Sequence, residues 1–137
     1  IVNERKEAPI KTTRELVALL TPIIPKHIFN KIIAKVFQAI RIEVNDELGV
    51  IKSFLKQTID ILKQNGRLVC ISYHSLEDRL VKYFIREGKF EGIAESDLYG
   101  NKYLPFKKIG GLIIPSEKEI KFNSRSRSGK LRIAVRI

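Results

Sequence analysis

The 137-residue sequence has no methionine, no tryptophan and a single cysteine. Because even position 1 is not methionine, we expect that the chain does not begin at its own start codon: either a leader has been removed or the chain is a piece of a longer protein. Cys70 is expected to be a small buried residue in a reducing compartment, rather than a redox centre. With only two histidines beside it and no metal-ligand spacing, the sequence predicts no zinc site.

Long hydrophobic runs are also missing. The uninterrupted apolar segments fall far short of the ~20 residues that a membrane-spanning helix needs, and no segment resembles a signal peptide. We therefore expect no membrane partner and a cytoplasmic location. A chain of this length can bury one core, with at most a second small helical unit beside it.

Acidic residues are scarce at one end of the chain. From residue 102 to residue 137 there are ten Lys or Arg residues against two Glu, a surplus of +8, whereas the first 101 residues carry only +3 of the total charge of +11. Such an asymmetry indicates a polyanionic partner such as nucleic acid. The alternative is an ordinary solvated surface.

Helical periodicity dominates residues 1–63, which we interpret as one helical subdomain. Thr12-Thr-Arg-Glu15 has the pattern of a capping box and predicts a short helix that ends near Pro22. Apolar residues then recur at helical spacing from Phe29 to Lys63, and Gly49 is the expected division between two helices.

Residues 64–137 alternate between strand and helix patterns, which predicts an α/β unit with a sheet of about three strands. We expect a mixed sheet, in which the last strand lies beside the first and antiparallel to the second. The predicted elements are a buried strand at Leu68–Tyr73, a helix from Ser75 to about Arg86, a loop at 88–102, a strand at Phe106–Ile114, helical turns at Ser116–Phe122 and a strand at Lys130–Ile137.

Five polar residues follow the first predicted strand directly. In open α/β sheets, ligands bind where the carboxyl ends of strands meet the first turns of helices. An alternative is local capping, with Ser75 as the N-cap and Asp78 as its partner at the third helical position. The candidate substrate-binding residues at this position are His74, Ser75, Glu77, Asp78 and Arg79.

Two further clusters carry groups that suit a polar substrate. Gln38, Arg41 and Asn45 share one face of the long helical region, although a wet helix face would have the same pattern. Before the last strand, guanidinium groups alternate with serines, and such a segment can hold phosphate oxygens bidentately. The candidate phosphate-binding residues are Arg125, Arg127 and Lys130. The alternative is an ordinary solvated basic turn that binds no phosphate.

Three blocks together resemble a known family: residues 37–48, residues 66–79 and residues 123–132. In this order and separation they are similar to the carboxy-terminal half of the bacterial 16S rRNA cytosine N(4)-methyltransferase family (RsmH, formerly MraW). The resemblance covers essentially the whole chain. One departure lies at residues 30–35, where many members carry His-Pro-Ala-Thr-Arg and this chain has Asn-Lys-Ile-Ile-Ala-Lys, so no substrate contact of that motif is carried over.

The resemblance implies an enzyme that transfers a methyl group from S-adenosylmethionine to the exocyclic amino group of a cytidine in 16S rRNA. It also implies a partial class I, Rossmann-like methyltransferase sheet at 64–137, preceded by an inserted helical subdomain at 1–63 on the substrate side. The family's cofactor loop and acidic ribose partner belong to the amino-terminal half. We therefore expect S-adenosylmethionine to be bound there, no catalytic base to be assignable here, and this chain alone to be inactive.

The partners implied are the small ribosomal subunit and the amino-terminal half of the same protein. Two other interpretations stay open: a non-catalytic basic RNA-binding module, and a set of blocks that only fixes an interdomain angle. Because the Leu68–Tyr73 strand is apolar on both faces, as central strands are, an unpaired edge there should recruit another chain. We expect self-association through this edge, or through exchange of the Phe29–Lys63 helical region.

Overall fold

The computed structural model describes all residues from Ile1 to Ile137. Contacts along the chain divide it into two compact units, Ile1–Asp46 and Glu47–Ile137, each of which is described by itself. The elements, in order, are α1 (Glu4–Glu7), α2 (Thr13–Leu20), the 3-10 helix η1 (Lys26–Ile28), α3 (Phe29–Val44), α4 (Glu47–Ile61), β1 (Arg67–Ser72), α5 (Ser75–Glu87), β2 (Phe106–Ile113), α6 (Glu117–Phe122), the 3-10 helix η2 (Ser124–Ser128) and β3 (Lys130–Arg136).

The first unit is helical, and α2 begins as the sequence predicts. The Glu15 backbone N–H donates to the Thr12 hydroxyl at 3.2 Å, and the Thr12 N–H donates to the Glu15 carboxylate at 3.3 Å. These two bonds satisfy donors that the first turn of a helix leaves without partners. The predicted capping box is therefore confirmed.

The long helical region divides three to four residues earlier than predicted. The break lies at Asn45 and Asp46, and Gly49 sits inside α4, so the predicted division at Gly49 is wrong. Asp46 adopts a left-handed backbone with φ of 47°, which a right-handed helix cannot continue through. The boundary between the two units falls at the same place, rather than at Lys63, because α4 packs against α5 through Leu55.

The second unit contains a three-stranded sheet in the order β1-β3-β2. β3 pairs with β1 from Arg67↔Val135 to Ser72↔Lys130, and with β2 on its other side. The predicted position of the last strand is thus confirmed. The predicted mixture of directions is not observed: both pairs are antiparallel, because β3 returns along the sheet against each of its neighbours.

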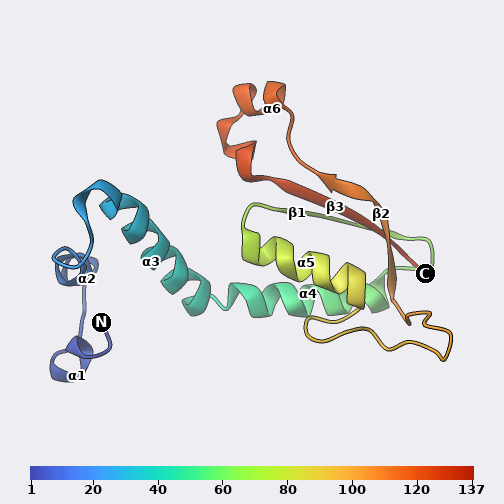
Figure 1. The fold of residues 1–137 in the computed structure, drawn as a ribbon, viewed down its shortest axis with the longest axis horizontal. Helices are drawn as coiled ribbons and strands as arrows, with labels where there is room; N and C mark the ends of the chain where they lie inside the picture. The colour runs from blue at the N-terminus through green and yellow to red at the C-terminus, as the bar shows by residue number, and fades with distance from the viewer. The chain divides into compact units, whose positions relative to one another are not determined.

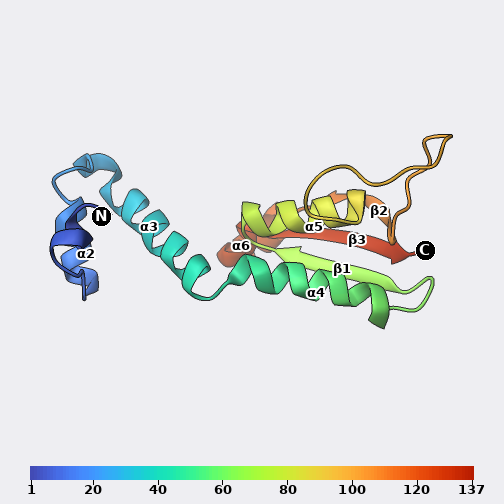
Figure 2. The same cartoon turned by 90° about the horizontal axis from the view of Figure 1, so that it is seen from below.

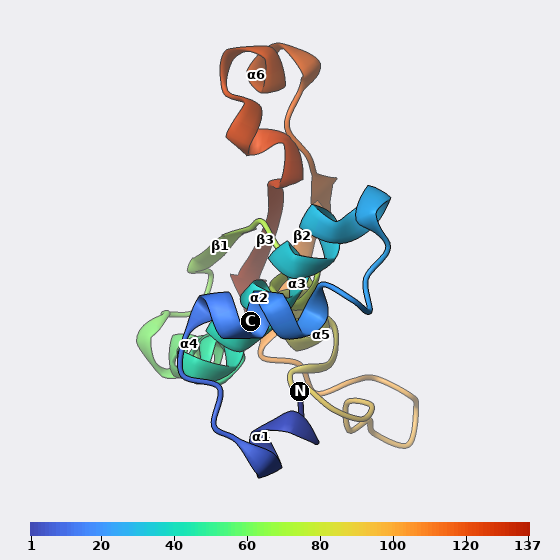
Figure 3. The same ribbon diagram turned by 90° about the vertical axis from the view of Figure 1, so that its left-hand side faces the viewer.

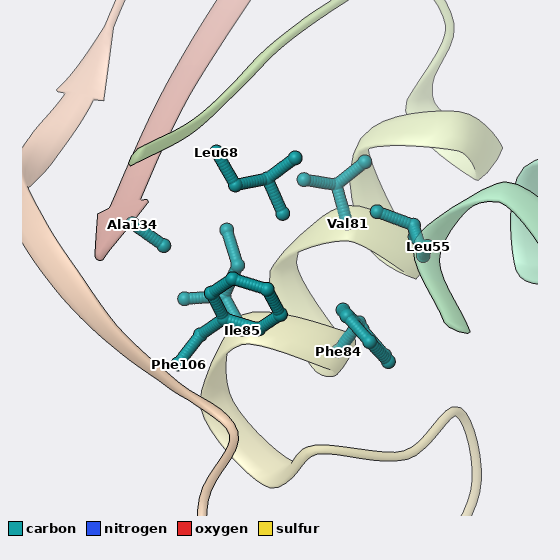
Figure 4. Packing of buried hydrophobic residues seen from close by; sticks show 7 residues of the cluster. All are labelled: Leu55, Leu68, Val81, Phe84, Ile85, Phe106 and Ala134. Carbon is teal, nitrogen blue, oxygen red and sulfur yellow. The ribbon is translucent and has the colours of Figure 1, made fainter. Parts of the chain in front are cut away.

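Two helices, α4 and α5, lie on the same face of this sheet (Figures 1 and 2). The core forms between these two helices and the sheet, and Figure 4 shows its side chains converging from the strands and helices. Burial of each large apolar side chain stabilises the fold by about 1.5–3 kcal/mol. The members of the core are Leu55, Leu68, Val81, Phe84, Ile85, Phe106 and Ala134.

The opposite face of the sheet carries exposed apolar side chains. Val69 is 55% exposed, Ile71 is 62% exposed and Ile113 is 48% exposed. β1 is also an edge strand, since its only partner in the chain is β3. As predicted, the first strand is therefore apolar on both faces, and only one of them is covered. None of the helices has the length and apolar character required to span a bilayer.

Candidate nucleic-acid interface

The chain passes from β1 into α5 through Tyr73 and His74, and this junction forms the first part of the candidate interface. The N-cap is His74, whose Nδ1 accepts a hydrogen bond from the Leu76 N–H at 3.4 Å. Glu77 reaches back, and its Oε2 accepts from the N–H groups of Tyr73 and His74, both at 3.2 Å. The predicted pair of Ser75 and Asp78 is therefore wrong by one residue.

Asp78 is directed toward β3 instead. Its carboxylate accepts two hydrogen bonds from the Arg132 guanidinium, at 2.6 Å and 3.1 Å, and lies 3.5 Å from the Lys130 ammonium. The bond from Arg132 is the main reason that the pKa of Asp78 lies below its ordinary value, against an opposing effect of burial. Asp78 is thus a buried anchor between α5 and β3.

The other candidate residues of this junction differ in exposure. Ser75 and Arg79 are exposed, and His74 and Glu77 are partly buried. Ser75 and Arg79 can meet a ligand directly, whereas the Glu77 carboxylate is already engaged by two backbone N–H groups. That these residues bind substrate stays a prediction.

The second part of the interface is the hairpin cap, which we define as residues Ser116–Ser128 between β2 and β3. α6 begins as predicted, with the Ser116 hydroxyl accepting from the Glu119 N–H at 3.2 Å. Asn123 then organises η2: its Oδ1 accepts from the Arg125 N–H at 3.1 Å, and its carbonyl oxygen accepts from the Ser126 hydroxyl at 2.7 Å. The hairpin cap stands beyond the end of the sheet in Figures 1 and 3.

Burial within the hairpin cap separates its serines from its arginines. Ser126 is only 7% exposed, while Arg125 and Arg127 on either side of it are exposed. Gly129 closes the turn at a site with no room for a side chain, because a Cβ there would lie 2.9 Å from the Ser126 carbonyl oxygen. The two guanidinium groups are therefore presented to solvent from a turn with fixed backbone geometry.

Strand pairing brings the two parts of the interface together. The register Ser72↔Lys130 places the end of β1 beside the start of β3, so the second and third sequence blocks meet at one end of the sheet. A pocket of about 170 Å³ lies there, lined by apolar residues of β1 and β2 together with Tyr73, Glu119 and Lys130. The arrangement offers cations, hydrogen-bond donors and an aromatic ring in one place.

A basic pocket on the α5 side of the sheet was not predicted. It has a volume of about 150 Å³, and its wall includes Lys82, Arg86, Lys108 and Arg132. The alternation of polar and apolar residues in the last strand could have indicated that Arg132 faces the helices, because it places this residue on the same face as the buried Ala134. Arg132 is paired with Asp78 and Arg86 with Glu87, so the pocket carries less net positive charge than its four basic residues indicate.

Gln38, Arg41 and Asn45 lie in the first unit, at the end of α3. Gln38 is partly buried, and Arg41 and Asn45 are exposed. Asn45 ends the helix, with its backbone N–H donating to the carbonyl oxygens of Arg41 and Glu43. That these three residues reach the same cleft as His74 stays a prediction.

Cofactor-binding features are not found at the junction of β1 and α5. A dinucleotide-type loop would place glycines where this chain has Tyr73 and His74. The described residues also contain no group of three or more His, Cys, Asp or Glu side chains that could hold a metal ion.

Comparisons with known proteins agree with the blocks described above. A family model described as the MraW methylase family matches residues 1–137. A protein of Christiangramia forsetii is 59% identical over 137 residues, and one of Flavobacterium johnsoniae is 57% identical over 137 residues; both are named ribosomal RNA small subunit methyltransferase H. A third protein of that name, from Parabacteroides distasonis, is 45% identical over 138 residues. The matches cover 100% of this chain and 45% of each relative, so the chain spans about half the length of these proteins.

Proposed function

Because the chain belongs to the MraW methylase family, we propose that it is the RNA-binding part of a methyltransferase that modifies the small-subunit ribosomal RNA. The reaction proposed is transfer of a methyl group from S-adenosylmethionine to the exocyclic amino group of a cytidine in 16S rRNA. This work would take place in the cytoplasm, on the ribosomal subunit or its RNA.

The observation that carries the proposal is the meeting of two sequence blocks at one end of the sheet. The junction at His74 and the hairpin cap are 40 or more residues apart in sequence, yet the Ser72↔Lys130 register makes them neighbours. Arg125 and Arg127 are exposed there and can hold phosphate oxygens bidentately. Cationic groups beside a strand end suit a substrate that carries both phosphates and a reactive base.

Roles follow from exposure and charge. We assign the phosphate contacts to Arg125, Arg127 and Lys130, which form a basic surface next to the strand end. The substrate-side contacts are assigned to the junction residues His74, Ser75, Glu77 and Arg79, and to Gln38, Arg41 and Asn45 of the first unit. Asp78, which is buried in its pair with Arg132, would position this junction instead of touching substrate. Of the junction residues, Ser75 and Arg79 are the most exposed, so they are the first to test.

S-adenosylmethionine would be bound outside this chain, by the amino-terminal half of the longer enzyme. The exposed face and free edge of β1 supply a surface for that half: Val69 and Ile71 are more than half exposed although they belong to an apolar strand. Apolar strand faces are stabilised by a covering layer. On this proposal, the chain by itself transfers no methyl group.

A segment exchange tests the proposal. This chain would replace the matching 45% of the Christiangramia forsetii relative, and transfer of labelled methyl groups to small-subunit RNA would be measured. We expect the chimera to bind S-adenosylmethionine and methylate the RNA, and the 137-residue chain alone to do neither. Arg79→Ala should lower methylation, whereas Glu91→Gln, at an exposed loop residue, should not.

The outcome also separates the second candidate function. A folded chimera that binds RNA but transfers no methyl group would favour a non-catalytic basic RNA-binding module. A micromolar S-adenosylmethionine site on the isolated chain, measured by calorimetry, would contradict the proposed location of the cofactor.

A further inference from the structure

Phe122, the last residue of α6, is 95% exposed, which is unusual for a large aromatic side chain. Burial of such a ring in a core would stabilise the fold by about 1.5–3 kcal/mol. Phe122 contributes none of this, although apolar residues of the same hairpin, such as Ile120 and Leu131, are partly buried. Its ring is therefore accessible to a partner.

The charges around Phe122 indicate what kind of partner fits. From Ser116 to Lys130 the chain has five basic residues and two acidic ones, Glu117 and Glu119, and no acidic residue follows the ring. Lys121 precedes the ring directly, and Arg125 and Arg127 follow it on η2. An aromatic ring among guanidinium and ammonium groups is the composition of surfaces that bind single-stranded nucleic acid, where bases stack on rings and cations hold the backbone.

The backbone on either side of the ring is held by hydrogen bonds. The Asn123 N–H donates to the Glu119 carbonyl oxygen at 2.7 Å, and the Ser126 N–H donates to the Asn123 carbonyl oxygen at 3.0 Å. The ring thus sits at a hydrogen-bonded joint between α6 and η2. A preorganised joint loses little conformational freedom on binding.

One other exposed aromatic ring, that of Tyr99, lacks this setting. Tyr99 is 91% exposed in the loop between α5 and β2, but its neighbours there include Glu95 and Asp97. The Asp97 carboxylate accepts from the Tyr99 N–H at 2.9 Å, which places a negative charge next to that residue. A phosphate backbone would be repelled from Tyr99, so this residue serves as a matched control.

We propose that Phe122 is a stacking platform for an unpaired RNA base, with Lys121, Arg125 and Arg127 holding the flanking phosphates. This inference rests on the proposed function. It adds a preference for unpaired RNA that the charges alone do not provide. Phosphate contacts are made equally to paired and unpaired strands, whereas a stacking ring needs a base whose face is open. The hairpin cap therefore favours single-stranded RNA over a duplex.

The test compares Phe122 variants of the 137-residue chain for binding to a short single-stranded RNA that carries a fluorescent adenine analogue. Phe122→Ala is expected to weaken binding about ten-fold and to abolish the fluorescence change that stacking produces. Phe122→Trp should retain both signals, and Phe122→Leu should lose them, because leucine keeps the apolar character without the ring. Binding of the matching duplex should change little in all variants, and Tyr99→Ala should bind as the unmodified chain does.

The salt dependence distinguishes this inference from the function that it rests on. Phe122→Ala should leave the slope of affinity against salt unchanged, since no phosphate contact is lost. Salt-dependent RNA binding that Phe122→Ala does not weaken would overturn the stacking role and leave the phosphate contacts standing. No RNA binding by the unmodified chain would overturn both. A change in self-association without a change in RNA binding would instead assign Phe122 to a protein contact and overturn the proposal.

Discussion

The Arg132 guanidinium binds both carboxylate oxygens of Asp78, across 54 residues of sequence. Both side chains are largely buried, with 15% and 11% of their surfaces exposed. The pair connects the first turn of α5 with the third residue of β3. It therefore fixes the junction after β1 relative to the strand that leaves the hairpin cap.

We expect Asp78→Asn to lower the free energy of unfolding by about 3 kcal/mol, at the low end of the cost of breaking a buried pair, because both groups keep some contact with water. The reason is that the Arg132 charge would be left buried without its partner. Urea unfolding measures the effect, with the exposed Glu91→Gln as the control. Replacing Asp78 and Arg132 together should cost less than the sum of the single changes; additive costs would contradict the coupling.

Glu77 allows capping to be separated from substrate binding. Glu77→Ala should lower stability by about 1 kcal/mol, because two backbone N–H groups lose their acceptor. Glu77→Gln should keep the stability, since an amide oxygen can accept the same bonds. If methylation by the chimera described above falls in Glu77→Gln while the unfolding midpoint stays constant, the carboxylate acts on substrate. If both properties stay constant, Glu77 only caps the helix.

Much of the second unit could be predicted because its signals are local. The apolar run at 68–73, the strand pattern at 106–114 and the alternation of residues 130–137 predict three strands, and the structure contains all three. The break between α3 and α4 could not be predicted in the same way. Glycine at position 49 is a weaker helix former, but its cost of about 1 kcal/mol is tolerated, whereas Asp46 takes the left-handed backbone.

The candidate site likewise contains residues that could be predicted from local sequence and residues that could not. Exposed residues such as Arg125 and Arg127 could be proposed from composition alone. The bond between Asp78 and Arg132 could not, because it depends on the register of β1 with β3. The one-residue error at the N-cap has a similar cause: both His74 and Ser75 can cap a helix, and only the reach of the Glu77 side chain decides between them.

The contacts of Glu87 predict that acid lowers the stability of the protein where the loop after α5 is attached. Its carboxylate accepts from the Lys102 ammonium at 2.7 Å and from the Ala94 N–H at 3.0 Å, and these bonds lower its pKa from 4.5 to about 2. A carboxylate whose pKa is lowered by folding contributes stability that is fully present above pH 4.5 and is lost as the pH falls toward 2. We expect the urea midpoint to fall over this range, and to fall less steeply in Glu87→Gln. Equal slopes in the two proteins would refute the assignment.

The proposed phosphate contacts predict a defined salt dependence. Affinity of the 137-residue chain for a small-subunit RNA segment should fall steeply with salt, because binding releases condensed counterions. Substituting Arg125→Gln and Arg127→Gln should flatten the logarithmic slope by about one unit per lost contact. Lys56→Gln combined with Lys63→Gln, at two exposed lysines in and just after α4, is the charge-matched control. An unchanged slope in the double variant would indicate that both arginines are ordinary surface residues that contact no phosphate.

Self-association is the last prediction. Sedimentation of the 137-residue chain should depend on concentration, because β1 has an unpaired edge and exposed apolar residues. Ile71→Lys should weaken the association by placing a charge on that strand, while Ile93→Lys, at a 73% exposed loop residue, should not. Association that survives Ile71→Lys would favour exchange of the α3 and α4 segment. A monomer at all concentrations would contradict both routes.

The irregular pairing of β2 has an evolutionary consequence. The register of β2 with β3 shifts between Ile109 and Ile113, whereas β1 and β3 pair without interruption. Arg132 is therefore aligned by β1, and the segment from Gly110 to Ser128 can gain or lose residues without moving it. That segment contains the hairpin cap. If the hairpin cap binds RNA as proposed, insertion or deletion within it would change that contact and leave the core that supports it unaltered.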